Sequence, residues 1–180
     1  MKTGYRAVEV RFALDETAPG VFEGYGSVYG VLDSYNTVFM PGVFAASLTE
    51  HRAAGTVPMM LWQHSPSREI GEWLEIREDP QGLFVRGRID LEAPGGAKAH
   101  RMLKGAEVRG LSVGFRRRKT SLLADGSTAI LQADLIEISP VRRPSNPRAR
   151  VTDVRSATAS PTGLAEHIRR FAAIIGGQHA

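Results

Sequence analysis

Short strand-like segments follow one another through most of this 180-residue chain, with turns between them instead of regularly spaced helices. The clearest turn is residues 79–82, read DPQG, because proline at its second position and glycine at its fourth suit a type I turn. Steps of hairpin length favour antiparallel pairing, and the missing strand–helix rhythm argues against a doubly wound α/β sheet. We therefore expect a mainly β (α+β) protein with a largely antiparallel, closed or nearly closed β-barrel and short peripheral helices. Periodicity and turn signals predict strands at residues 5–14, 21–31, 57–63, 70–77, 83–91, 108–119 and 128–139.

Three short helical patterns accompany the strands. Residues 41–54 and 95–104 each end directly before a glycine, the usual residue after a helix C-terminus. Residues 164–175 carry an apolar stripe at helical spacing. A linker rich in Ser, Thr, Pro and Gly precedes this last helix. We therefore expect a β-barrel domain over residues 1–155 and a linker with a helical tail over residues 156–180.

Composition excludes several classes of site. The chain has no cysteine, which excludes a disulfide framework, a thiolate zinc site and a cysteine nucleophile. No metal-binding or nucleotide-binding motif is found, so we expect no metal and no cofactor. No apolar run approaches the roughly 18 residues of a membrane span, and the first residues lack the apolar core of a signal peptide, so we expect a cytoplasmic protein without a membrane partner. The net charge is +4, but the basic run at residues 116–119 has no interleaved aromatic side chains, which makes nucleic acid an unlikely partner.

A serine lies at the centre of the apolar segment at residues 108–115, read VRGLSVGF. Strand alternation divides the segment between two faces, one with Leu111, Val113 and Phe115 and the other with Gly110, Ser112 and Gly114. Glycine inside a strand often marks the close approach of another backbone or a ligand. We interpret Ser112 as a candidate nucleophile and Gly110 and Gly114 as candidates for a substrate cleft. The alternative is a serine on a crowded sheet face.

A serine nucleophile needs a base, and the base needs a third group that orients it. Of the five histidines, only His64 ends an apolar strand beside a turn; the others lie on expected helices or in the tail. The segment ADLIEIS at residues 133–139 offers Glu137 as third group and Asp134 as second choice. Regular alternation would put Glu137 and Leu135 on one face of the strand. Asp134 would lie on the opposite face. The alternatives are a hydrogen-bonded boundary histidine and a salt bridge from the carboxylate to a nearby arginine.

Five segments, taken together, carry a family resemblance. In chain order they read GYGSVYG, MPGVF, LWQHSPSREIGEW, VRGLSVGF and LIEISPVRRPSNPRARV. They resemble the prohead maturation proteases of tailed bacteriophages (caudoviruses), a family regarded as related to the herpesvirus assemblins. The resemblance covers residues 8–151 and implies a serine endopeptidase on an assemblin-like β-barrel.

The resemblance also implies roles for individual residues. Matched position by position, Ser112 would be the nucleophile, His64 the general base, and Glu137 the third member, where the herpesvirus relatives use a second histidine. Arg142 and Arg143 fall in a region comparable to the one that helps to stabilise the oxyanion in assemblins, and are candidates for that role.

A setting and partners are implied as well. The family acts inside the immature capsid, in the cytoplasm of the bacterial host. It cleaves scaffolding protein or the scaffold-like N-terminal segment of the major capsid protein, and often itself. Assemblins act as dimers, so a homodimer is a further expectation. The tail at residues 156–180 would then be a cleavable or capsid-docking segment.

Two other functions remain open from the sequence. A non-catalytic capsid-assembly or scaffold-binding module would not need His64 and Ser112 to meet. A nucleic-acid-binding β-barrel would need exposed aromatic residues on a basic sheet face. The protease hypothesis requires that the Ser112 hydroxyl and a His64 ring nitrogen approach to about 2.6–3.2 Å, or somewhat farther without substrate.

Overall fold

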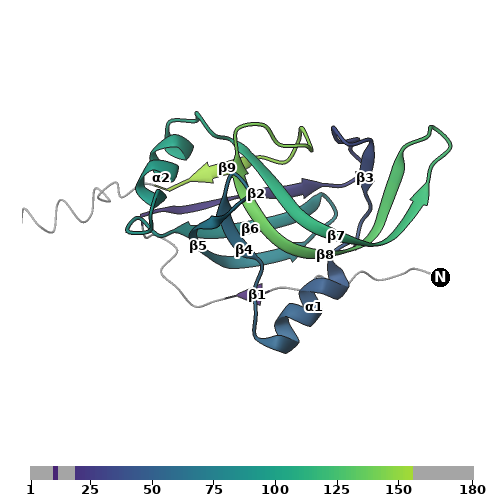
Figure 1. Ribbon diagram of the computed structural model, residues 1–180, viewed down its shortest axis with the longest axis horizontal. Helices are drawn as coiled ribbons and strands as arrows, with labels where there is room; N and C mark the ends of the chain where they lie inside the picture. Colours follow the sequence, from purple (N-terminus) through teal and green to yellow (C-terminus); the bar gives the residue numbers. More distant parts are fainter. Residues whose placement is uncertain (1–9, 12–18, 156–180) are drawn as a thin grey trace, which may run out of the picture.

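The structure, a computed structural model, describes residues 10–11 and 19–155. Within these ranges the chain forms nine strands and two helices (Figure 1). The strands are β1 (Val10–Arg11), β2 (Val21–Val28), β3 (Thr37–Phe39), β4 (Met59–Trp62), β5 (Ser65–Glu78), β6 (Gly82–Ile89), β7 (Gly110–Leu122), β8 (Thr128–Val141) and β9 (Val151–Val154), and the helices are α1 (Ala45–Ala54) and α2 (Gly96–Lys104). The expected linker and tail at 156–180 lie outside the described residues, as does most of the strand expected at 5–14. Neither α1 nor α2 is long and apolar enough to cross a membrane.

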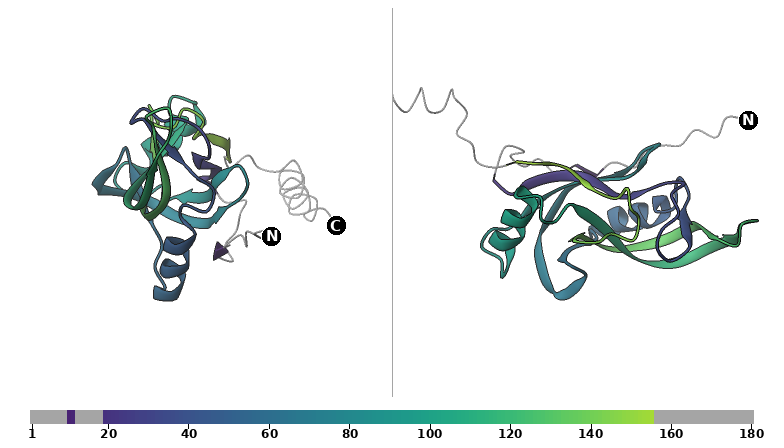
Figure 2. Two further views of the ribbon diagram at one scale, coloured as in Figure 1. Left: turned by 90° about the vertical axis from the view of Figure 1, so that its right-hand side faces the viewer. Right: turned by 90° about the horizontal axis from the view of Figure 1, so that it is seen from above.

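All nine strands belong to one curled sheet (Figure 2). The neighbours along it are β3, β8, β4, β5, β6, β2 and β9, while β1 pairs with β5 and β7 pairs with β8. β3 and β4 run parallel to β8, and the other pairs are antiparallel. The mainly β prediction is confirmed, but the expectation of a closed or nearly closed, largely antiparallel barrel is wrong. The sheet is mixed because β3 and β4 run parallel to β8. It is open because β7 meets the β9 end of the sheet only through an isolated bridge, between Gly110 and Arg150 just before β9.

The parallel pairs arise from the β3–α1–β4 segment. Two strands joined through a helix can lie parallel, whereas a hairpin forces them antiparallel. Here the chain follows the edge of β8 first as β3 and then, after α1, as β4. Sequence reasoning placed these strands by hairpin-sized steps and therefore missed the crossover.

Local turn chemistry was predicted well. The turn at residues 79–82 closes the β5–β6 hairpin, with the Asp79 amide donating to the Gly82 carbonyl at 2.9 Å. Gly26 lies at a bulge of β2. Two boundaries differ from expectation. α1 begins at Ala45 instead of residue 41, because Gly42 at φ +85° is not helical. β5 begins at Ser65, in a segment expected to be a turn.

A single hydrophobic core fills the concave side of the sheet. α1 packs beside β8 and buries Leu48, with Phe44 from the preceding turn, and α2 lies at the other end of the molecule (Figure 1). Leu111 of β7 and Ile138 of β8 are fully buried in the same core. The predicted apolar face of the serine strand is thereby confirmed, and the opposite face of β7 and β8 is left for polar side chains.

Candidate active site

β8 contains one extra residue where it passes the serine strand. Gly114 of β7 opposes Glu137, and the next residue, Phe115, opposes Leu135, so Ile136 has no partner on β7. Residues opposed across an antiparallel pair lie on the same face of the sheet. The bulge therefore sends Leu135 into the core and turns Glu137 to the polar face.

This bulge corrects the expected alternation of residues 133–139. A regular strand would put Leu135 and Glu137 on one face. In the structure Glu137 instead shares the polar face with Asp134, which opposes Arg116 of β7. Both carboxylates are thus on the face of Ser112, and their neighbours distinguish them.

Ser112 lies on that polar face, directly opposite Ser139 of β8. Its side chain is largely buried, with 7% of the residue exposed. Opposed Cβ atoms in an antiparallel pair are about 4.5–5.5 Å apart and diagonal neighbours about 7–8 Å, so the Ser112 side chain lies next to that of Ser139 and diagonally across from that of Glu137. In the part of the chain that the structure describes, the Ser112 hydroxyl makes no hydrogen bond, and so none to His64.

His64 reaches the same face from β4, which lies along the edge of β8 opposite β7. It follows β4, whose Met59 lies beside Glu137 in parallel register. Its Nδ1 is 2.5 Å from Oε1 of Glu137, and its backbone amide donates to Oγ of Ser139 at 3.1 Å. Ser139 in turn donates to Oε2 of Glu137 at 2.6 Å. Both oxygens of Glu137 therefore have a donor, and Ser139 ties the histidine to the strand of the glutamate.

The direction of this hydrogen bond decides the tautomer of His64. A carboxylate only accepts, so Nδ1 carries the proton and Nε2 is the free basic nitrogen of the neutral ring. Of the His64 side chain 42% is exposed, against 8% for Glu137, so the imidazole is open to a substrate while its partner is sheltered. This is the arrangement that a general base requires.

The His64–Glu137 hydrogen bond raises the pKa of His64 above its ordinary value of about 6.5. Partial burial acts in the opposite direction, and the negative charge of Glu137 adds to the rise. The protonated imidazole is thus stabilised by the carboxylate, as in a catalytic histidine that must accept a proton.

The backbone at His64 is unusual. Gln63 and His64 both have positive φ angles, +54° and +60°, which non-glycine residues seldom adopt. Two such residues in succession turn the chain sharply at the end of β4 and aim the His64 ring back over β8. Backbone strain of this kind is often found at functional sites.

The two glycines of the serine strand do not leave open space. A Cβ on Gly114 would clash with the Glu137 carboxylate, with Cδ only 2.9 Å away, and a Cβ on Gly110 would lie 2.6 Å from Pro144 Cδ. The room beside each glycine is filled by the protein itself. The interpretation of Gly110 and Gly114 as a substrate cleft is therefore replaced by another: Gly114 makes room for Glu137.

Arg142 and Arg143 follow β8 directly and are exposed. The backbone amide of Arg142 donates to Oε1 of Gln63 at 3.4 Å, a long hydrogen bond. Since Gln63 precedes His64, this amide lies in the neighbourhood of the histidine. Nε2 of Gln63 is buried and has no hydrogen-bond partner among the described residues.

Asp134, the second choice for the third group, has a different role. Its Oδ2 accepts from Nε of Arg116 at 2.9 Å, and its Oδ1 pairs with Arg118. Arg118 also contacts Glu50 of α1 with Nη1 at 2.7 Å from Oε1. Hydrogen bonds from Arg118 and then Arg116 hold the pKa of Asp134 below its ordinary value. Asp134 is thus part of an ion-pair network that joins α1 to the β7–β8 hairpin.

Sequence reasoning missed two features of the site. Ser139 was not singled out, although a serine two residues after the glutamate in a strand is placed for a hydrogen bond to it. The bulge at Ile136 has no local signal, because it contains neither glycine nor proline.

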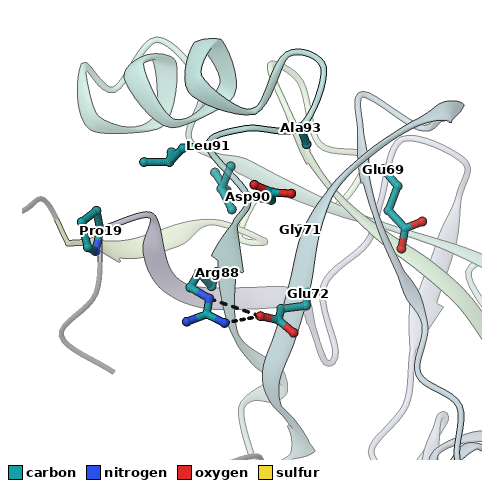
Figure 3. A pocket seen from close by; sticks show the side chains of 9 residues that line it. Pro19, Glu69, Gly71, Glu72, Arg88, Asp90, Leu91 and Ala93 are labelled. Carbon is teal, nitrogen blue, oxygen red and sulfur yellow. Dashed lines mark hydrogen bonds and ion pairs between the residues drawn. The ribbon is translucent and has the colours of Figure 1, made fainter. Parts of the chain in front are cut away.

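A separate surface depression lies away from these residues (Figure 3). Its lining includes Glu69, Glu72, Arg88 and Asp90. Arg88 donates to Glu72 across it, with Nε–Oε1 at 3.2 Å. The described residues contain no cluster of three or more potential metal ligands.

Comparison with known proteins relates the chain to phage proteases. A family model described as caudovirus prohead serine protease matches residues 6–163. The prohead protease of Enterobacteria phage HK97 is 30% identical over 156 residues, covering 86% of this chain and 68% of that protein. The capsid polyprotein of Pseudomonas phage PAJU2 is 33% identical over 104 residues, which cover 53% of this chain and 15% of the polyprotein.

A solved structure supports the fold. The capsid assembly protease of bacteriophage T4 superposes with a TM-score of 0.54 at 9% identity, covering 75% of this chain and 94% of that one. At such low identity the likeness concerns the fold alone. The family model spans most of the chain, and the HK97 relative agrees with it: this chain belongs to the caudovirus prohead serine protease family.

Proposed function

We propose that this chain is a prohead maturation endopeptidase in which Ser112 is the nucleophile, His64 the general base and Glu137 the group that orients His64. Family membership supports the reaction class. The single observation that carries the residue assignment is the 2.5 Å hydrogen bond from His64 Nδ1 to Glu137, on the sheet face that also bears Ser112. Without substrate, catalytic hydrogen bonds are often long or unformed, so an unbonded Ser112 hydroxyl is compatible with this role.

The mechanism follows from the tautomer of His64. Oγ of Ser112 attacks the carbonyl carbon of the scissile peptide bond while Nε2 of His64 takes the hydroxyl proton. When the C–N bond breaks, His64 gives that proton to the leaving amine, and an ester to Ser112 remains. A water molecule, deprotonated by His64, then attacks the ester; His64 returns that proton to Oγ of Ser112 as the ester C–O bond breaks, and the acid is released. Glu137 stays ionised and stabilises the imidazolium in each half of the cycle.

The tetrahedral intermediate needs a hydrogen-bond donor for its oxyanion. Our first candidate for this donor is the backbone amide of Arg142, and our second is Arg143. Within the described residues the Arg142 amide donates only the 3.4 Å hydrogen bond to Gln63, and a developing oxyanion would replace Gln63 as its acceptor.

The proposed substrates are scaffolding protein or a scaffold-like N-terminal segment of the major capsid protein, and the chain itself. The similarity to part of a protein named capsid polyprotein supports this class. The proposed place of action is the interior of the prohead in the bacterial host cell. A homodimer remains part of the proposal, through the likeness to assemblins.

The test is co-expression of the full chain with its candidate coat and scaffolding proteins. Mass spectrometry of the coat N-terminus should show processing with the wild-type chain and none with Ser112→Ala, while circular dichroism shows both chains folded. Processing at the normal rate by Ser112→Ala would mean that the nucleophile is another residue. Assembly without any processing by the wild-type chain would favour the non-catalytic capsid-assembly module.

A further inference from the structure

α1 contacts the backbone of β8 on the edge opposite β7, over a stretch where neither β3 nor β4 pairs with β8. On this edge, β3 pairs with β8 up to Ile130 and β4 pairs from Glu137 onward. The gap between them is bridged by the segment that contains α1, which lies beside β8 in Figure 1. The Ala133 amide donates to the Val43 carbonyl at 2.9 Å just before the helix.

Two side chains of α1 bind the residue that opens the bulge. The amide of Leu135 donates to Oγ of Ser47 at 3.0 Å, in a buried site. Nε2 of His51 is 3.0 Å from the carbonyl oxygen of Leu135. Because a carbonyl only accepts, Nε2 of His51 carries a proton, and its Nδ1 faces the Thr56 hydroxyl at 2.9 Å. Both backbone groups of Leu135 are thus satisfied by a helix instead of a strand.

This contact matters because a bulge can move along a strand. A slip of one residue turns every side chain beyond it to the opposite face. Ile136 is the extra residue, and it separates Leu135, which faces the core, from Glu137. In a regular strand without this bulge, Glu137 would lie on the same face as Leu135 and would therefore point toward the core. The orientation of Glu137 toward His64 therefore depends on the position of the bulge.

We propose that His51, assisted by Ser47, is a positioning residue of the active site: it fixes the β8 bulge at Leu135 and Ile136 and so keeps Glu137 on the face of His64 and Ser112. His51 touches none of the reacting groups. The proposal rests on the proposed function only in its consequence for cleavage, since the position of Glu137 has a readout of its own.

That readout is the proton between His64 Nδ1 and Glu137, which a 2.5 Å hydrogen bond should shift far downfield in the proton NMR spectrum. It is recorded in the full chain carrying Ser112→Ala, so that cleavage plays no part. Adding His51→Leu should remove this resonance and lower the midpoint of the His64 titration toward about 6.5. Adding His51→Gln, which retains an N–H donor at the place of Nε2, should preserve both.

The cleavage readout uses the same substitutions in the active chain. His51→Leu should lower kcat about 10- to 100-fold with a smaller change in KM, as expected when a catalytic group is misplaced. His51→Gln should restore most of the activity. The matched control is His100→Leu on α2, which removes a histidine whose Nε2 lies 3.4 Å from the Arg155 carbonyl, far from the site. It should change neither readout.

The proposal is overturned if His51→Leu folds and keeps the downfield resonance, the titration midpoint and a kcat within about twofold of wild type. Should His51→Leu fail to fold, Ser47→Ala takes its place, because it removes only the acceptor for the Leu135 amide, and the same loss or retention of the resonance decides. If the resonance responds to His51→Leu but the wild-type chain cleaves nothing, the proposed function fails while the positioning of Glu137 stands. If cleavage responds and the resonance does not, the positioning fails and the proposed function stands.

Discussion

Glu137 and Asp134 are three residues apart on β8, lie on the same face of the sheet and are nearly equally buried, with 6% and 9% of each residue exposed. Their partners differ in chemistry. Glu137 accepts from the His64 ring and from the Ser139 hydroxyl. Asp134 pairs with two guanidinium groups, those of Arg116 and Arg118. An imidazole gains and loses a proton near neutral pH, whereas a guanidinium stays charged.

The difference shows that burial and charge alone do not identify a catalytic carboxylate. Asp134 is neutralised permanently, so it can fasten the β7–β8 hairpin to α1 but cannot support proton transfer. Glu137 faces a base whose charge changes, so it can stabilise one protonation state over the other. The bulge at Ile136 separates the two environments along the strand.

The largest effect among carboxylate changes is expected from Glu137→Gln. The amide cannot stabilise the imidazolium and also permits the wrong tautomer of His64, so cleavage should fall by about 10³- to 10⁴-fold with some activity left. The measurement is kcat/KM for processing of the coat precursor, with circular dichroism as a folding control. A smaller loss than that caused by Asp134→Asn would reverse the roles assigned to the two carboxylates.

A second change tests the space that Glu137 occupies. Gly114→Ala should displace the carboxylate, because a Cβ there clashes with Oε1, and cleavage should fall about 100-fold through misplacement of the His64 partner. The control is Gly105→Ala after α2, where φ is −77° and the nearest atom to a new Cβ is the Arg101 carbonyl oxygen at 3.2 Å. Equal activity of the two variants would show that Glu137 tolerates displacement.

The pH dependence of cleavage should also distinguish Glu137 from Asp134. His64 must be neutral to act as base, and its pKa is raised by Glu137, so the rate should increase with pH through a midpoint above about 6.5. Glu137→Gln should move this midpoint down toward that value, and Asp134→Asn should leave it in place. A midpoint that stays constant in Glu137→Gln would contradict the pairing.

The same shift has a consequence for stability. The folded-state pKa of His64 lies above its unfolded value, so the pair stabilises the fold fully below about pH 6.5, and this contribution is lost as the pH rises through the folded pKa. The free energy of unfolding from urea titrations should therefore differ more between wild type and Glu137→Gln at mildly acidic pH than above the folded-state pKa of His64.

Local chemistry carried the successful predictions of the fold. Proline and glycine at residues 79–82 predicted the hairpin, Gly55 predicted the end of α1, where it is found in a left-handed conformation, and the alternation around Ser112 predicted its apolar and polar faces. Each of these depends on residues within a few positions of one another.

Features that depend on distant parts of the chain were not predictable. Nothing in ADLIEIS indicates a bulge, because its cause lies in Ser47 and His51, more than eighty residues earlier. The crossover that makes β4 parallel to β8 likewise depends on how α1 docks. Glu137 was preferred to Asp134 from the segment itself and again through the family resemblance, but the two carboxylates could be told apart physically only by their hydrogen-bond partners.

The smallest effect is expected from Asp134→Asn. The side-chain amide of the new asparagine keeps one oxygen that can accept from Arg116. It removes the negative charge of Asp134, so that Arg118 is left with Glu50 as its charged partner. Cleavage should stay within about twofold of wild type, because such peripheral ion pairs contribute little to the position of groups elsewhere. Thermal unfolding at low and high salt should show a modest loss of stability that salt diminishes, since the side chains of Arg116 and Arg118 are 77% and 30% exposed and screening weakens pairs that solvent reaches. Glu50→Gln, on the α1 side of the same network, is the matched variant and should behave alike.

A loss of cleavage in Asp134→Asn without a change in unfolding would instead make Asp134 a participant in the reaction, and the two carboxylates would then act as one site.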